Sequence, residues 1–171
     1  MKRILFFILI SFLFYSCDQP GSTRIVEHKQ DSIFLYTRLM AFKATHHNWS
    51  QNEVKRAEIN SIFTDSINSW KSQGDFLKGI VFQLESVGEY KDNGQTVYGA
   101  TFRKSSFDGD SVTMDIMGIV NKSDVDKLIN NKHYALRGDV VKTLDRQPGL
   151  IADYYDLGAY RVKITEFKQA D

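Results

Sequence analysis

The chain has 171 residues, with 22 Lys and Arg against 21 Asp and Glu, so its formal net charge is +1. A near-neutral chain has no broad positive field to attract phosphate backbones, which argues against nucleic acid as the main partner. It contains one cysteine, so an internal disulfide and a cysteine-rich metal cluster are excluded.

The first seventeen residues have the pattern of an export signal. Lys2 and Arg3 are followed by a nearly uninterrupted apolar run, which ends at the small residue Ser16 and at Cys17. The run is shorter than the roughly 20 residues needed to span a bilayer. We therefore predict a signal peptide over residues 1–16 that is removed from the mature protein.

Residues 13–17, Leu-Phe-Tyr-Ser-Cys, resemble a lipobox, the motif at which bacterial lipoproteins are acylated on cysteine and cleaved before it. Phe14 and Tyr15 depart from the small or aliphatic residues usual there. The aromatic signal and the body rich in Asn, Lys and Ile resemble Bacteroidetes-type lipoproteins. The resemblance implies palmitate-type lipidation of Cys17 and attachment to the inner or outer membrane, facing the periplasm or the cell surface. The alternative is an ordinary signal peptide with an incidental cysteine.

Residues 17–23 are expected to be a short polar tether between the lipid and the folded domain. Each buried CH₂ of an acyl chain contributes about 0.8 kcal/mol, so several chains would hold the protein stably at the membrane. Without Lys2 and Arg3 the mature chain has 20 basic and 21 acidic residues, a net charge of −1. With Cys17 acylated, no thiol remains for disulfides or catalysis.

Residues 24–74 are expected to form an αα-hairpin. Apolar residues recur at helical spacing over residues 25–45. Ser50 and Glu53 match a capping box at the start of a second helix, which we expect to end at Gly74. The apolar stripe of this helix needs a partner surface, so the hairpin is not expected to be stable alone.

Beyond residue 74 the apolar period changes from 3.6 to 2, which indicates strands. Asn93-Gly94 is typical of a type I′ hairpin turn, and Asp108-Gly109 marks a second turn, so three antiparallel strands should form a meander. Residues 123 and 124 cap a short helix. A fourth strand near residues 134–144 and a fifth near 160–164 follow, separated by a loop from Asp145 to Leu157.

This order of elements resembles an OB-fold, a five-stranded barrel with a helix between its third and fourth strands. Gly138-Asp139-Val140 resembles a run found in OB domains of the anticodon-binding type, and the resemblance covers residues 76–168. It implies an α+β fold with the hairpin at 24–74 and a five-stranded antiparallel OB-like barrel at 75–171. The competing architecture packs the helices on an open antiparallel sheet, as in small outer-membrane assembly lipoproteins and cystatin-like domains.

OB domains bind ligands along strands two and three and through adjoining loops, so the resemblance implies a ligand surface in that region. Mixed charge around it favours a protein, peptide or glycan over a nucleic acid. The alternative for the two tyrosines at residues 154 and 155 is that they close one end of the barrel. The candidate ligand-binding residues are Tyr90, Lys91, Arg103, Asp115, Tyr154 and Tyr155.

Other motifs point to structure more than to chemistry. Adjacent histidines such as His46 and His47 diverge, so with His28 they are expected to be surface or packing residues and not metal ligands. In Arg137-Gly138-Asp139 the glycine indicates a strand bulge. Asp108 and Asp110 are expected to satisfy backbone groups of their own turn. Ser111 follows an aspartate and precedes a valine, a pattern of Bacteroidetes O-glycosylation sites.

No spacing in the chain is typical of a catalytic nucleophile with its base, and we expect no cofactor and no metal. The sequence therefore predicts a lipid-anchored cell-envelope protein that acts as a non-catalytic binding or assembly module with an envelope protein as its partner. The alternatives are a periplasmic enzyme of the hydrolase type and an inhibitor or immunity-type lipoprotein.

Overall fold

A computed structural model describes residues 33–92, 94–152 and 154–170. The predicted signal peptide, the tether, Cys17 and His28 lie outside these residues. The elements of the described chain are α1 (Phe34–Thr45), α2 (Glu53–Lys71), β1 (Val81–Asp92), β2 (Gln95–Phe107), β3 (Asp110–Val120), α3 (Lys122–Val125), β4 (His133–Thr143), β5 (Gly149–Ile151) and β6 (Tyr154–Ala170). The α+β class predicted from the sequence is confirmed.

The two long helices pack through apolar side chains spaced one turn apart. Helix α1 buries Leu35, Leu39 and Phe42, and α2 buries Ile59, Phe63 and Ile67. The rings of Phe42 and Phe63 meet edge to face with centroids 5.1 Å apart, which joins the helices to each other. These stripes need a partner surface, as expected, and the strands supply it.

The predicted capping box at the start of α2 is wrong. The N-cap is Asn52, whose side-chain oxygen accepts the backbone N–H of Lys55 at 2.7 Å. Glu53 is the first helical residue, so it cannot fill the third helical position that a box with Ser50 requires. The helix also ends earlier than expected, at Lys71 in place of Gly74.

Six strands form one mostly antiparallel sheet in the order β3-β2-β1-β4-β6-β5, with an additional parallel pairing between β3 and β6. The meander of β1, β2 and β3 is confirmed by its two antiparallel registers. The fifth strand expected near residues 160–164 is β6, which is much longer. The expected loop from Asp145 to Leu157 contains the short strand β5 and the start of β6, so that part of the loop prediction is wrong.

Glycines occupy the positions where the sheet turns or bends. Asp108 and Gly109 both have positive φ, 45° and 82°, as a type I′ turn requires, and the predicted second hairpin turn is confirmed. The register of β4 on β6 shifts between Arg137 and Gly138. A Cβ at Gly138 would collide with the carbonyl oxygen of Lys163, so the expected bulge depends on glycine.

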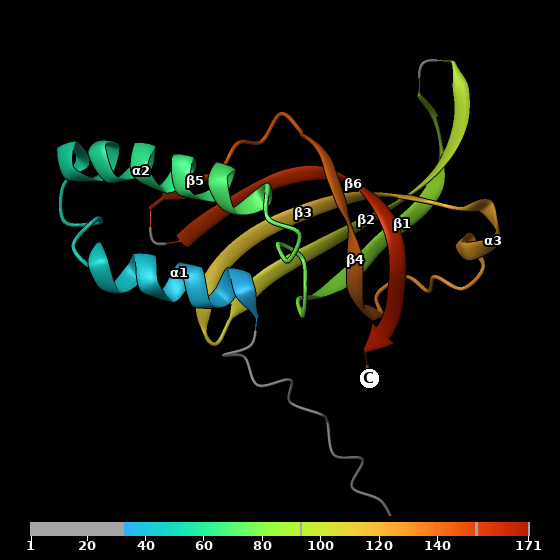
Figure 1. The fold of residues 1–171 in the computed structure, drawn as a ribbon, viewed down its shortest axis with the longest axis horizontal. Coiled ribbons are helices and arrows are strands. Elements are labelled where there is room, and N and C mark those ends of the chain that lie inside the picture. Colours follow the sequence, from blue (N-terminus) through green and yellow to red (C-terminus); the bar gives the residue numbers. More distant parts are fainter. Residues whose placement is uncertain (1–32, 93, 153, 171) are drawn as a thin grey trace, which may run out of the picture.

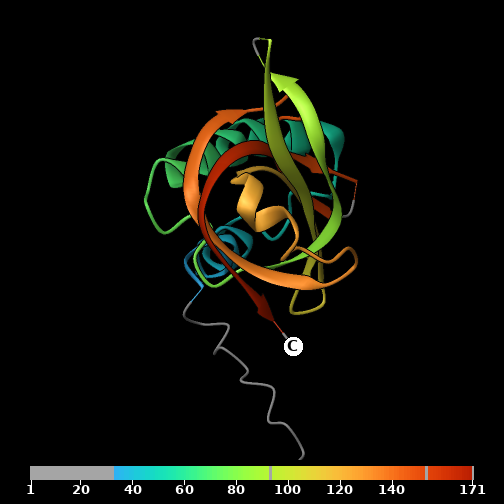
Figure 2. The ribbon, with the colours of Figure 1, turned by 90° about the vertical axis from the view of Figure 1, so that its right-hand side faces the viewer.

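Helices lie at both ends of the curved sheet. Figure 1 shows α1 and α2 at one end and α3 at the other, and Figure 2 shows the strands curving around α3. Strand β3 alternates buried residues such as Met114 and Ile116 with half-buried ones, so one of its faces lines the core. The largest fully buried side chains include Tyr134, Tyr160, Phe63, Phe82, Phe102 and Phe107.

Helix α1 is held to the turn between β2 and β3 by two polar contacts. The ammonium of Lys43 lies 2.6 and 2.8 Å from the two carboxylate oxygens of Asp110, and Tyr36 donates its hydroxyl to Asp108 at 3.1 Å. The hydrogen bond to Asp110 raises the pKa of Lys43. The two carboxylates therefore bind α1 and do not serve their own turn, which corrects the sequence interpretation.

Candidate functional site

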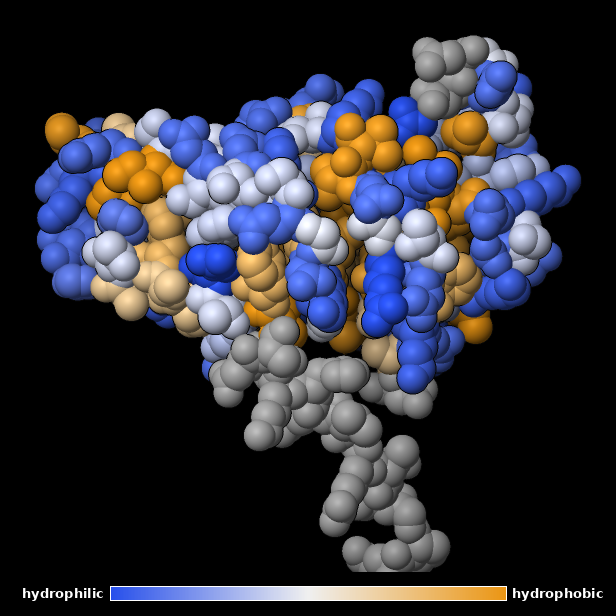
Figure 3. Space-filling model, in the orientation of Figure 1, coloured by the Kyte–Doolittle hydropathy of each residue, from blue (hydrophilic) through white to orange (hydrophobic). Residues whose placement is uncertain are grey.

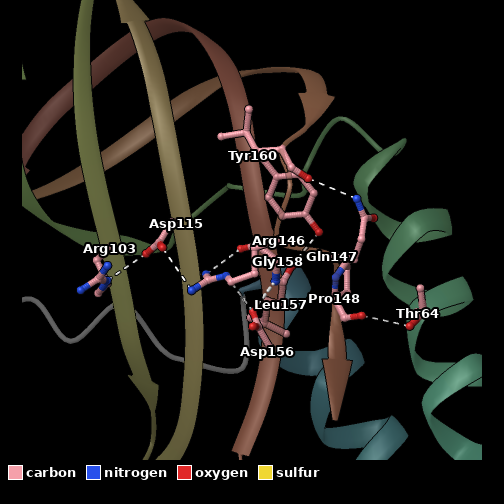
Figure 4. Close-up of polar contacts among 11 residues, drawn as sticks. Thr64, Arg103, Asp115, Arg146, Gln147, Pro148, Asp156, Leu157, Gly158 and Tyr160 are labelled. Carbon is pink, nitrogen blue, oxygen red and sulfur yellow. Dashed lines mark hydrogen bonds and ion pairs between the residues drawn. The ribbon is translucent and has the colours of Figure 1, made fainter. Parts of the chain in front are cut away.

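A line of alternating charges, which we call the charge network, runs over the outer face of β1, β2, β3 and β6 and includes one residue of the β4–β5 connection, Arg146. Its members are Glu85, Arg103, Asp115, Arg146 and Asp156. Strand alternation explains its position, because Phe102, Met114 and Ile116 point into the core and their neighbours point outward. Figure 4 shows the network from Arg103 on β2 to Asp156 on β6.

The exposed part of the network is centred on Arg103. Its guanidinium lies 2.9 Å from Glu85 and 2.9 Å from Asp115, one strand on either side. The hydrogen bond to Asp115 raises the pKa of Arg103. Asp115 also lies 3.2 Å from Arg146, so one carboxylate connects two arginines. Such a shared arrangement orders the side chains of three strands.

The buried part of the network fixes the connection from β4 to β6. Asp156 is only 2% exposed, lies 3.3 Å from the Nε of Arg146, and accepts the backbone N–H of Gly158 at 2.8 Å. Burial raises the pKa of Asp156, against the opposing effects of Gly158 and Arg146. Arg146 also donates to the carbonyl of Gly158 at 3.1 Å.

Tyr160 completes this connection. Its buried hydroxyl donates to the carbonyl of Leu157 at 2.6 Å, and burial raises its pKa. Gly158 has a φ of 89°, a conformation that side chains rarely adopt, and a Cβ at this position would lie only 3.0 Å from the hydroxyl of Tyr160. The arrangement is structural, because its two carboxylates, Asp115 and Asp156, already pair with Arg146 and, for Asp156, with the Gly158 amide.

Tyr90 lies on the same outer face, farther along β1. Its ring lies against Gly99, where even a methyl group would collide with it, and the Arg161 guanidinium is 5.8 Å from the ring centroid. Arg161 also donates to the hydroxyl of Tyr90 at 3.5 Å. A hollow of about 140 Å³ lies beside this ring, lined by Ser86, Gly88, Glu89, Tyr90, Gly99, Ala100, Thr101 and Met117.

The structure brings together only part of the predicted ligand site. Arg103 and Asp115 form an ion pair, and Tyr90 shares their face. Lys91 is exposed and donates to the hydroxyl of Thr96 at 2.6 Å. Tyr154 and Tyr155 begin β6 at the end of the sheet near α2, away from the tip of the β1–β2 hairpin (Figure 1).

Tyr155 is a core residue. It is 5% exposed, accepts the indole N–H of Trp49 at 3.2 Å, and packs against the rings of Trp49 and Phe63. Tyr154 beside it is half-buried. For Tyr155 this placement agrees with the packing alternative, in which the tyrosines close one end of the strands.

Sequence reasoning did not identify Arg146 or Arg161 as members of this face. Arg146 lies in a connection without periodic pattern, so no local signal could place it. Arg161 alternates with the buried residues Tyr160 and Val162, and strand alternation could have placed it on the outer face.

The described histidines lie at the surface or pack against an aromatic ring. The ring of His46 lies against that of Phe42 in a tilted contact, with centroids 4.5 Å apart, and His47 and His133 are exposed. Within the residues that the structure describes, no group of three His, Cys, Asp or Glu could hold a metal ion. The same residues contain no helix that is long and apolar enough to cross a membrane.

Larger hollows lie on other faces and are shallow. One of about 340 Å³ adjoins the β4 bulge, and one of about 510 Å³ lies between α2 and β5. Hydrophobic residues form separate patches among hydrophilic ones on the face shown in Figure 3. Neither hollow has an extended charge network like that of the outer face.

The chain was compared with protein-family models, with curated proteins and with solved structures, and no match was found. The charges of the outer face are paired with each other, and the arrangement suits recognition of a partner by exchange of hydrogen bonds and ion pairs.

Proposed function

We propose that this chain is a lipid-anchored cell-envelope protein whose OB-like barrel binds a protein, peptide or glycan through the outer face described above. In this proposal Cys17 carries the lipid, the helical hairpin covers one end of the barrel, and no reaction is catalysed. The partner is an envelope component at the inner or outer membrane, and nucleic acid is not among its ligands.

The strand pairings support the OB-like barrel. β1 pairs with β2, β2 with β3, β3 with β6, β6 with β4, and β4 with β1, so the pairings return to the strand where they began. The β3–β6 pairing is parallel and the others are antiparallel, and the short helix α3 lies between β3 and β4. Strand β5 is then an addition beside β6.

The observation that carries the binding proposal is the contrast between the packed interior and the ordered outer face. Core residues such as Phe102, Met114 and Tyr160 are fully buried, so the interior is filled by side chains. Arg103 is about half exposed at its side chain, 48%, although two carboxylates hold it in place. A fixed but accessible guanidinium offers a preorganised donor to a ligand at low entropic cost.

Cross-linking in intact membranes tests the binding proposal. We expect the full-length protein to form a discrete cross-linked product with one envelope component, and Arg103→Ala to reduce its yield. Arg137→Ala is the matched control, because Arg137 of β4 is also exposed and lies 3.2 Å from Glu166 of β6 in a single surface ion pair. Equal yields for both variants and the unaltered chain would refute the outer face as the binding surface.

Mass spectrometry of the protein from its native membrane tests the anchor separately. We expect an N-terminal fragment that begins at Cys17 with acyl chains attached, and Cys17→Ala should abolish acylation and release protein from the membrane fraction. A wild-type terminus without lipid would contradict the anchor and leave the binding face to be judged by cross-linking.

A further inference from the structure

Strand β1 has a neighbour on both sides only along its first residues. Val81–Gln83 pair with β4, and the backbone N–H and C=O of Leu84 bond to Lys132 and Asn131 at 2.8 Å each. From residue 85 to residue 92, β2 lies on one side of β1, and no strand of the described chain lies on the other. Such an edge is a template for a further strand.

The edge of β5 shows how this protein covers a strand that would otherwise be open. Asn60 of α2 accepts the backbone N–H of Leu150 at 2.6 Å, and Thr64 donates to the carbonyl of Pro148 at 3.0 Å. The β1 edge lies on the hairpin formed with β2, which extends away from the helices in Figures 1 and 2.

The charged side chains along this edge of β1 are complementary to those on the same edge of a second molecule. We propose that two copies of this chain pair antiparallel through residues 88–92 of β1, about a two-fold axis at which Tyr90 faces its counterpart. Glu89 of each copy then lies directly opposite Lys91 of the other, which gives two opposite-charge pairs on one face. Opposite charges at facing positions stabilise a sheet, and like charges destabilise it.

Shifted symmetric registers are less favourable. An axis at Glu89 brings two carboxylates face to face, and an axis at Lys91 brings two ammonium groups face to face. An axis at Gly88 would use Glu85 opposite Lys91, but Glu85 already lies 2.9 Å from Arg103. Charge therefore selects Tyr90 as the centre. Five paired residues in each copy form a small contact, so the dimer is weak and reversible.

A charge-swap series tests the proposal on the full-length protein in detergent, by sedimentation over a wide concentration range. Glu89→Lys and Lys91→Glu each replace two opposite-charge pairs by two like-charge pairs and should raise the dissociation constant about tenfold. The double swap E89K/K91E restores opposite charges and should restore the wild-type constant. A wild type that is monomeric throughout, or a dimer of equal strength in all four forms, overturns the proposal.

Disulfide trapping tests the register. Tyr90→Cys places facing Cβ atoms within disulfide range, because directly opposite residues of paired strands are that close. Val97→Cys is the matched control, since Val97 pairs with Tyr90 on β2 and lies one strand away from the edge. The wild type, with Cys17 alone, is the blank. We expect a cross-linked dimer from Y90C only, and equal cross-linking of V97C refutes the register.

Discussion

Replacing Arg146 by methionine should destabilise the fold by about 3 kcal/mol at pH 7. The change removes the contacts of Arg146 to Asp115, Asp156 and the carbonyl of Gly158 at 3.2, 3.3 and 3.1 Å, and leaves Asp156 as a buried charge. Loss of one partner of a buried pair costs about 3–5 kcal/mol, and we take the lower value because the Arg146 side chain is 34% exposed.

Two further measurements test whether the uncompensated charge of Asp156 causes the loss of stability in R146M. In the double variant R146M/D156N the buried position carries no charge, so most of the lost stability should return. Burial already raises the pKa of Asp156, and removal of Arg146 raises it further. The folded state then binds a proton at a higher pH than the unfolded state. Its stability therefore falls as pH rises between these two pKa values.

Urea unfolding followed by circular dichroism measures all four forms, wild type, R146M, D156N and R146M/D156N, at pH 7 and pH 5. The deficit of R146M relative to the wild type should be smaller at pH 5. An R146M protein within about 0.5 kcal/mol of the wild type at pH 7 would refute the reasoning, since surface changes have effects of that size.

Three further changes test other parts of the fold by the same unfolding measurement. Gly138→Ala should cost about 2 kcal/mol because its methyl group meets backbone, whereas Gly88→Ala, with open space around its Cβ, should be nearly neutral; equal stabilities would argue against the bulge. Tyr155→Phe should cost about 1–3 kcal/mol by leaving the buried indole N–H of Trp49 without its acceptor, and an unchanged midpoint would mean that another group replaces it. Asn52→Ala should cost about 1 kcal/mol through loss of the helix cap, and no change would show that the cap contributes nothing.

The parts of the fold with strong local signals were predictable from the sequence. Alternating apolar residues and the glycine turns specify the meander of β1, β2 and β3. The start of α2 was misplaced because Ser50 and Asn52 are both good caps, and only the tertiary position of the first turn distinguishes them. Strand β5 has three residues, too few for an alternation to show, and it depends on pairing with β6.

The candidate site was predictable only where it lies on regular strands. Arg103 and Asp115 alternate with core residues, so their shared outer face follows from the strand period. Arg146 reaches Asp115 across a distance of 31 residues in sequence, and only the pairing of β6 with both β3 and β4 brings them together. Tyr155 was named as a ligand candidate because the OB resemblance placed it in a binding loop, and its burial could not be foreseen because it depends on Trp49 and the docked helices.

The amide of Leu150 offers a way to observe the helices directly. Its proton is held by the Asn60 side chain of α2, at 2.6 Å, and not by a neighbouring strand. Its rate of exchange with deuterium therefore reports how often α2 lifts off β5, while the amides of the β2–β3 ladder report the opening of the sheet. The exchange rate of this one amide can thus distinguish local opening of the helical layer from global unfolding in the intact protein.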